Sequence, residues 1–128
     1  MKYMLLVYSE EKSLTKEERE KCYAESAQLC RDLDARGQYV SASPLQPVAT
    51  AASVRVRNGK PVVTDGPFAE TREQLGGYYV VEAVDLNAAL SIAAKIPAAR
   101  WGTIEVRPVM EIAGLPEETA TTHMERKL

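Results

Sequence analysis

Acidic side chains gather between two strand-like runs in the middle of the chain. Asp65 directly follows the run Val62–Thr64, and Glu70 and Glu73 precede a second run that starts at Tyr78. Carboxylates on one short connection can move a proton to and from a substrate when partial burial raises the pKa of one of them. The connection therefore predicts an acid–base site, with Asp65, Glu70 and Glu73 as the candidate catalytic residues.

The same carboxylates also have a structural interpretation. Asp65 stands before Gly66-Pro67, and an aspartate in such a turn commonly accepts hydrogen bonds from loop amides. Glu70 and Glu73 could cap or solvate a short helical turn over residues 69–75. Both interpretations stay open at the level of sequence.

Candidate ligand contacts lie beside these carboxylates. Phe68 is the only phenylalanine of the chain, and it could line a pocket for an aromatic or apolar ligand or plug the end of the fold. Tyr78, at the start of the following strand, is a second candidate contact. Arg55 could bind an anionic substrate, although arginines on strands are more often solvated or paired at a dimer rim.

Residues that other mechanisms need are missing or badly placed. The only histidine is His123, close to the C-terminus, so no Ser-His-Asp or Cys-His arrangement has a base inside the fold. Two helical cysteines and one remote histidine do not make a zinc site. Phosphate loops and dinucleotide fingerprints are absent, and Gly76-Gly77 is best explained as a bulge or sharp bend. We therefore expect neither a cofactor nor a metal.

The composition is typical of one soluble domain. The chain has 128 residues, of which 45% are hydrophobic and 27% charged. Its net charge of −2 gives no field that would attract nucleic acid or an anionic membrane. The apolar run at the N-terminus is too short for a signal peptide or a spanning helix. Cys22 and Cys30 lie too far apart on a helix for a disulfide, which favours reduced thiols and a cytoplasmic location.

Helix signals are clearest in the first third of the chain. Thr15 and Glu18 have the spacing of a capping box, and Gly37 can adopt the left-handed conformation that ends a helix. We therefore predict a helix over residues 15–36, after a buried strand at residues 3–8. The predicted buried stripe of this helix consists of Cys22, Tyr23, Ala27, Cys30 and Leu33.

The rest of the chain predicts a hairpin and a second βαβ half. Residues 53–57 alternate between apolar and polar, and Asn58-Gly59 is the preferred type I′ hairpin turn. After a strand at residues 78–83, Asp85 caps a second helix, and a final strand covers residues 103–107. The predicted buried stripe of the second helix consists of Leu86, Ala89, Leu90, Ala93 and Ile96.

This order predicts an α+β fold, the ferredoxin-like split βαβ arrangement with an inserted β-hairpin and two helices on one face of an antiparallel sheet. The strand at residues 3–8 is apolar on both faces, so the face without helices also needs a cover. We predict that a second copy covers it in a homodimer packed sheet on sheet. Residues 1–113 would form the domain, and residues 114–128 a C-terminal tail that could contact a partner.

The stretch Val63–Tyr79 carries the string Thr-Asp-Gly-Pro-Phe-Ala-Glu-Thr-Arg-Glu. It resembles the signature of the YCII-related family, also called DGPF or DGPFAETKE proteins. The resemblance extends over residues 2–112 and includes residues 51–57 and Ile96–Pro108. It implies a dimeric α+β barrel, in which the cleft of each protomer holds a small-molecule site.

The wider group implied by this resemblance includes muconolactone isomerase, a dehydrochlorinase of a chlorinated hydroxyquinol and small monooxygenases. By analogy, the resemblance suggests cofactor-free proton transfer on a small cyclic or aromatic carbonyl compound, by an isomerase, lyase or dehydrochlorinase.

YCII proteins are proposed to use a His-Asp pair, with the histidine on the first helix. Here Ser26 stands near that position, so Ser26 becomes a candidate substrate contact and the acid–base role would pass to the region of Asp65. The alternative is a non-catalytic ligand-binding or regulatory dimer, because such proteins are often associated with extracytoplasmic-function sigma factors.

Overall fold

The computed structural model describes residues 1–116, so most of the predicted tail over residues 114–128, including His123, lies outside the described residues. The elements, in chain order, are β1 (Lys2–Ser9), α1 (Lys16–Ala35), β2 (Tyr39–Pro44), the 3₁₀ turn η1 (Val48–Thr50), β3 (Ala52–Arg57), β4 (Lys60–Asp65), β5 (Gln74–Glu82), α2 (Leu86–Ala93), the 3₁₀ turn η2 (Pro97–Arg100) and β6 (Thr103–Pro108). The predicted succession of two βαβ halves around a hairpin is confirmed.

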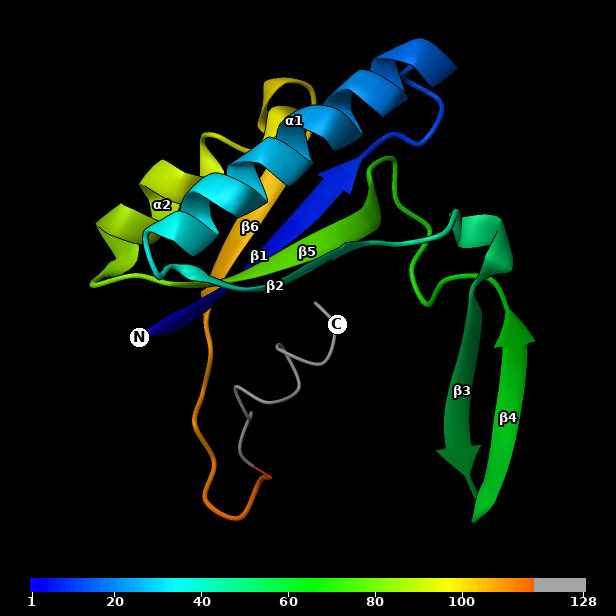
Figure 1. Cartoon of the computed structure of the whole chain (residues 1–128). Helices are drawn as coiled ribbons and strands as arrows, with labels where there is room; N and C mark the ends of the chain where they lie inside the picture. Colours follow the sequence, from blue (N-terminus) through cyan, green and yellow to red (C-terminus); the bar gives the residue numbers. More distant parts are fainter. Residues whose placement is uncertain (117–128) are drawn as a thin grey trace, which may run out of the picture.

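Four strands form an antiparallel sheet in the order β2-β5-β1-β6. Strands that are neighbours in this sheet come from different βαβ halves, which is the ferredoxin-like arrangement. Both helices lie on one face of the sheet (Figure 1). The predicted α+β, ferredoxin-like fold with two helices on one face is therefore confirmed.

Helix α1 begins and ends as its sequence predicts. The Thr15 hydroxyl accepts a hydrogen bond from the Glu18 amide at 3.1 Å, and the Glu18 carboxylate accepts one from the Thr15 amide at 2.9 Å. This reciprocal pair satisfies two of the amide groups that a helix start leaves without partners. Gly37, at φ 71°, follows the helix end in the left-handed conformation.

The hydrophobic core lies between the helices and the sheet. Its buried members are Tyr3, Leu5, Leu29, Leu33, Tyr79, Val81, Ala83, Ala89, Ile92, Ala93 and Ile96. On α2 the predicted stripe is partly wrong, because Leu86 and Leu90 are each 47% exposed while Ile92 is buried. Helix α2 faces the sheet with the stripe formed by Ala89, Ile92 and Ala93, so Leu86 and Leu90 fall on its flank.

The stripe predicted for α1 is also only partly correct. Leu33 is buried as expected, and Leu29, which was not predicted, is buried beside it. Tyr23 is 56% exposed, and Ala27 is exposed as well. The physical reason is that α1 turns the side with Leu29 and Leu33 toward the core, which leaves Ala27 on the outer side, while Tyr23 borders a hollow beneath the N-terminal half of the helix.

Strands β3 and β4 pair only with each other among the described strands. They project away from the four-stranded sheet, on the side opposite the helices (Figure 1). Asn58 and Gly59 both have positive φ, 53° and 74°, which confirms the predicted type I′ turn. The hairpin is thus a separate two-stranded element with no helix over either face.

Candidate functional site

A cavity of about 560 Å³ lies between α1 and the four-stranded sheet. Small residues line it on both sides. Cys22, Ser26 and Cys30 recur every fourth residue on α1, so they share one face of the helix. Gly76 and Gly77 contribute to the lining from β5. The hollow has the size of a site for a small molecule, about 300–1,000 Å³.

The glycine pair shapes the sheet side of this cavity. Val7 of β1 pairs with Gly77, whereas Tyr8 pairs with Leu75, so Gly76 is an extra residue in β5. Such an insertion is a β-bulge, which bends the strand, and the prediction for Gly76-Gly77 is confirmed. A Cβ atom at Gly77 would lie 3.0 Å from the carbonyl oxygen of Ser43 on β2. Glycine at this position therefore allows β2 to lie close to β5 beside the cavity.

A polar pair, Tyr79 and Ser26, interrupts a largely apolar cavity wall. Tyr79 is 7% exposed, and the Ser26 side chain lies next to its phenol. Burial raises the pKa of the Tyr79 phenol, and the neighbouring Ser26 side chain only partly opposes this effect. The phenol is therefore neutral at physiological pH, so it keeps a proton that it can donate to an oxygen atom of a ligand.

Both cysteines are free thiols in the cavity wall. Burial raises the pKa of Cys22, with the charge of Glu25 adding to the effect, and burial likewise raises the pKa of Cys30. The thiolate is the nucleophilic form of cysteine, and a raised pKa makes it scarce at neutral pH. The two thiols therefore act as small wall groups.

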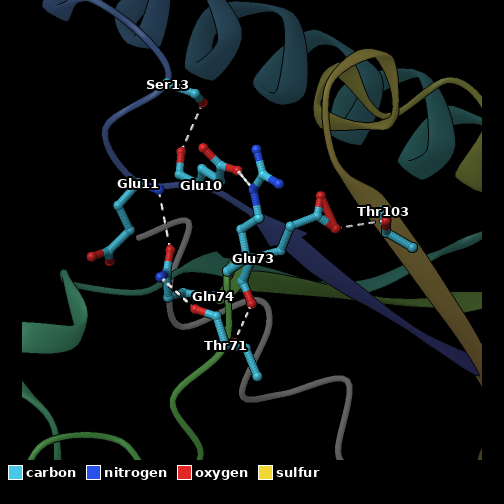
Figure 2. A network of polar contacts seen from close by, with 8 residues as sticks. Glu10, Glu11, Ser13, Thr71, Glu73, Gln74 and Thr103 are labelled. Carbon is cyan, nitrogen blue, oxygen red and sulfur yellow. Dashed lines mark hydrogen bonds and ion pairs between the residues drawn. The ribbon is translucent and has the colours of Figure 1, made fainter.

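Three charged residues, Glu10, Glu11 and Arg19, belong to the cavity lining. Figure 2 shows how two of them are connected to the chain around the start of β5. The Arg72 guanidinium donates to the Glu10 carboxylate at 2.5 Å, and the Glu11 amide donates to the Gln74 side-chain oxygen at 3.2 Å. The end of the carboxylate-bearing connection is thus tied to the cavity wall.

Glu73 takes part in the same network without lining the cavity. Its carboxylate accepts a hydrogen bond from the Thr103 hydroxyl at 2.8 Å, at the start of β6. Its backbone oxygen accepts from the Thr71 hydroxyl. The helical turn expected over residues 69–75 is wrong, because the chain there is irregular and then enters β5. These contacts fit the interpretation that Glu73 fixes the loop.

Asp65 and Glu70 do not reach the cavity. Asp65 ends β4, and both carboxylates are exposed. The expected partial burial of Asp65 is wrong for the single chain, because the hairpin stands apart from the helix-covered sheet and has no second layer to form a cleft. The set of Asp65, Glu70 and Glu73 is not assembled around one hollow. Their role as acid and base stays a prediction.

The four predicted ligand contacts fall into two separate places. Ser26 and Tyr78 belong to the lining of the main cavity, although Tyr78 precedes the buried Tyr79 on β5, so its side chain points to the sheet face without helices. Arg55 and Phe68 instead meet on the hairpin, where the Arg55 guanidinium lies 5.2 Å from the centre of the Phe68 ring, as in a cation–π contact. Phe68 is 77% exposed, and the hollow beside it is open and about 330 Å³ in size. Phe68 does not plug the end of the sheet.

Sequence reasoning missed Tyr79, the most deeply buried polar side chain of the cavity wall. The four-residue spacing of Cys22, Ser26 and Cys30 was a usable signal, because small residues on one helix face leave room beneath it. No comparable signal distinguishes Tyr79 from Tyr78. Which of the two faces the helices depends on the pairing register, since a shift of one residue exchanges the faces of a strand.

Within residues 1–116, no group of three or more His, Cys, Asp or Glu side chains is placed to hold a metal ion. None of the helices formed by these residues has the length and apolar character needed to cross a membrane.

Comparisons with known proteins agree with this fold. The model of the family described as "YCII-related domain" matches residues 1–113. An uncharacterised protein of Rhizobium meliloti (strain 1021) is 38% identical over 118 residues, which is 85% of this chain and 92% of that protein. Among solved structures, 5-chloro-2-hydroxyhydroquinone dehydrochlorinase from Burkholderia phenoliruptrix AC1100, in complex with 2,5-dihydroxybenzoquinone, is similar with a TM-score of 0.52. Its identity is 14%, over 86% of this chain and 94% of that one, so this likeness shows a shared fold.

Proposed function

Because this chain belongs to the YCII-related family, we propose that the cavity between α1 and the sheet binds a small cyclic or aromatic compound that carries carbonyl or hydroxyl oxygens. One observation supports this most strongly: the neutral, buried Tyr79 phenol, with Ser26 beside it, lies in the wall of a largely apolar hollow of about 560 Å³. Binding sites for small organic molecules combine these features, an apolar surface with a few polar groups that orient the ligand.

The aromatic side chains of the lining favour a flat ring. Tyr39, Tyr79 and Trp101 contribute aromatic surface to the wall, against which a ring can stack in an offset or edge-to-face arrangement. A ring oxygen that replaces solvent near Tyr79 and Ser26 would gain a hydrogen bond inside an apolar site. The ligand of the solved dehydrochlorinase structure, 2,5-dihydroxybenzoquinone, is an oxygen-bearing ring of this kind, and it supplies a first compound to test.

The chemistry that suits such a ligand is cofactor-free proton transfer, of the isomerase, lyase or dehydrochlorinase type. A hydrogen bond from Tyr79 to the ligand oxygen would stabilise the negative charge that develops there when a proton leaves the ring. The base would be a carboxylate. Glu11 is the first candidate, because it lines the cavity and its carboxylate is oriented by the Val48 amide at 2.9 Å. Asp65 is the second, by its place in the family signature.

A non-catalytic role is the second candidate function. It is favoured by the positions of Asp65 and Glu70, which lie outside the cavity and in contact with solvent. A ligand-binding or regulatory protein needs the hollow and the polar pair but no base. Turnover of a bound compound, followed by chromatography, separates the two roles. Glu11→Gln and Asp65→Asn then identify which carboxylate, if either, takes the proton.

We also propose the assembly and location that the sequence favours: a homodimer in which a second copy covers the sheet face opposite the helices, in the cytoplasm. Support for the dimer comes from β1, whose apolar residues alternate between the two faces of the sheet. Support for the location comes from the two free thiols.

The experiment that tests ligand binding is a thermal-shift screen of phenols, lactones, quinones and keto acids. A compound that binds only the folded state raises the melting temperature. Ser26→Phe should fill the cavity and abolish the shift, while Ala27→Phe, one residue further on the exposed side of α1, should retain it. Equal shifts in both variants would place the ligand somewhere else.

A further inference from the structure

We infer that the β3–β4 hairpin is an arm that packs against a second copy of this chain. The valines of the hairpin do not line the cavity. Three of them have large exposed fractions: 65% for Val54, 62% for Val56 and 68% for Val63. Val54 pairs with Val63 and Val56 with Pro61. Directly paired residues lie on the same face of an antiparallel pair, so these four side chains form one continuous apolar face, here called the valine face.

The hairpin needs a partner for physical reasons. A two-stranded hairpin on its own is at best marginally stable in water, and it usually requires further strands or a packed layer. Among residues 1–116, β3 and β4 pair with no other strand. An uncovered apolar strand pair of this kind is also a hazard for aggregation. We therefore expect the valine face to be buried against another surface.

The direction of the hairpin indicates that a second copy of this chain packs on the valine face. It projects to the side of the sheet that lacks helices (Figure 1). The same side carries apolar residues of the central strands, where Met4 lies opposite Val80 and Leu6 opposite Tyr78. A two-fold axis brings identical surfaces of two copies together. One association can therefore cover both the sheet face and the valine face.

Charges at the edge of the sheet support self-association. Glu105 and Arg107 lie on β6, directly beside Leu6 and Met4 respectively, and both are exposed. Because they carry opposite charges on one face, a two-fold arrangement can set Glu105 of each copy against Arg107 of the other. The surface is thus complementary to itself, with an apolar centre and a charged rim.

The length of the hairpin is sufficient for this role. Strand β3 has 6 residues, which at about 3.3 Å per residue span roughly 20 Å. Two sheets that pack face to face lie about 10 Å apart. An arm that starts at one sheet and runs toward the other can therefore pass the partner's sheet and reach the level of its helices.

Sedimentation of the full chain and of two matched double variants tests the arm. Val54→Glu/Val56→Glu places two carboxylates on the valine face, whereas Val62→Glu/Thr64→Glu places two, at the same spacing, on the opposite face. We expect a dimeric wild type whose dissociation constant rises by at least about tenfold in the first variant, because carboxylates are costly to bury, and stays within about twofold in the second. Circular dichroism checks that both variants are folded.

Two results would overturn the inference. One is a wild type that sediments as a monomer, which would leave the valine face for a different protein or for solvent. The other is equal dimerisation of the two variants, which would show that the valine face takes no part in the contact. Cross-linking of Lys60, at the tip of the arm, in mixed light and ¹⁵N-labelled protein adds an independent readout, since cross-links between light and heavy peptides arise only between copies.

Discussion

The cavity region and the hairpin region place similar side chains in opposite environments. In the cavity, the aromatic side chain of Tyr79 is 7% exposed, and burial shifts its pKa. On the hairpin, Phe68 is 77% exposed beside Arg55. The difference lies in the number of layers, because α1 covers the sheet while only two strands make the hairpin. Enclosure by a second layer, more than residue type, gives a side chain the environment that chemistry needs.

The stretch that resembles the family signature lies in the less enclosed of these two regions. Residues 64–73 run along and beyond the exposed hairpin in the single chain, outside the main hollow. The residues that form the hollow come mainly from α1 and β5. They include small side chains that do not form a recognisable sequence motif. A motif can therefore identify a relative without marking where its ligand binds.

The largest expected effect contrasts the core beneath α1 with the hairpin. Leu33→Ala removes a side chain that is 2% exposed, and we expect a loss of about 3 kcal/mol in the free energy of unfolding. Val62→Ala, on the face of the hairpin opposite the valine face, should change it by less than about 0.5 kcal/mol. Urea denaturation followed by circular dichroism measures both. Similar losses would mean that the hairpin belongs to the same packed core.

The next effect concerns the glycine pair beside the cavity. Gly77→Ala places a methyl group 3.0 Å from the Ser43 carbonyl oxygen, whereas the nearest atom to a methyl group at Gly76, the Val7 carbonyl oxygen, lies 4.0 Å away. We expect Gly77→Ala to cost about 2 kcal/mol through overpacking between β2 and β5, and Gly76→Ala less than about 1 kcal/mol. Denaturant midpoints of the two variants measured side by side check the contrast. The reverse order would show that the bulge, and not the close strand contact, requires glycine.

A smaller effect should appear in ligand binding. Tyr79→Phe removes the hydroxyl group from the cavity wall and should weaken the binding of an oxygen-bearing ring by about tenfold, the worth of one buried hydrogen bond. Tyr8→Phe is the matched control, because Tyr8 is a β1 tyrosine that does not line the cavity. Calorimetric titration with a compound from the thermal-shift screen measures both affinities. An unchanged affinity in Tyr79→Phe would remove this phenol from the site.

The smallest effect is a dependence on alkaline pH. Burial raises the pKa of Cys30 and that of Tyr79 above the ordinary values of a thiol and a phenol. Above those values, the unfolded chain loses these protons more readily than the folded chain does, so stability falls as pH rises. Below them, both groups are neutral in both states and contribute no pH dependence. Tyr79→Phe/Cys30→Ala should flatten the decline seen in denaturation between pH 8.5 and pH 10.5, and an identical slope would contradict the assigned burial.

The sequence predicted those parts of the fold that local residue chemistry controls. The capping box of Thr15 and Glu18, the type I′ turn of Asn58-Gly59 and the capping of α2 by Asp85 depend on interactions between near neighbours. The element order followed from hydrophobic periodicity, and with it the ferredoxin-like topology. The buried faces of α1 and α2 were less predictable, because the packing rotation of a helix depends on its partners.

The candidate site was only partly predictable because it depends on distant residues. Ser26 and Tyr78 belong to the cavity lining, but Asp65, which needs partial burial to act as an acid or base, lies on an exposed strand end. The second wall that Asp65 would need is not formed within residues 1–116. Tyr79 acquires its importance only from the antiparallel register of β5 with β1. The pairing of strands that are far apart in the sequence cannot be predicted from a short stretch of neighbouring residues.

A crystal structure of the protein soaked with 2,5-dihydroxybenzoquinone would show whether the cavity binds an oxygen-bearing ring. We expect the ring to lie between α1 and the sheet, with one of its oxygens within hydrogen-bonding distance, about 2.5–3.0 Å, of the Tyr79 hydroxyl. Density for the ring in the open hollow beside Phe68, or an empty cavity at saturating compound and at concentrations that raise the melting temperature, would contradict it.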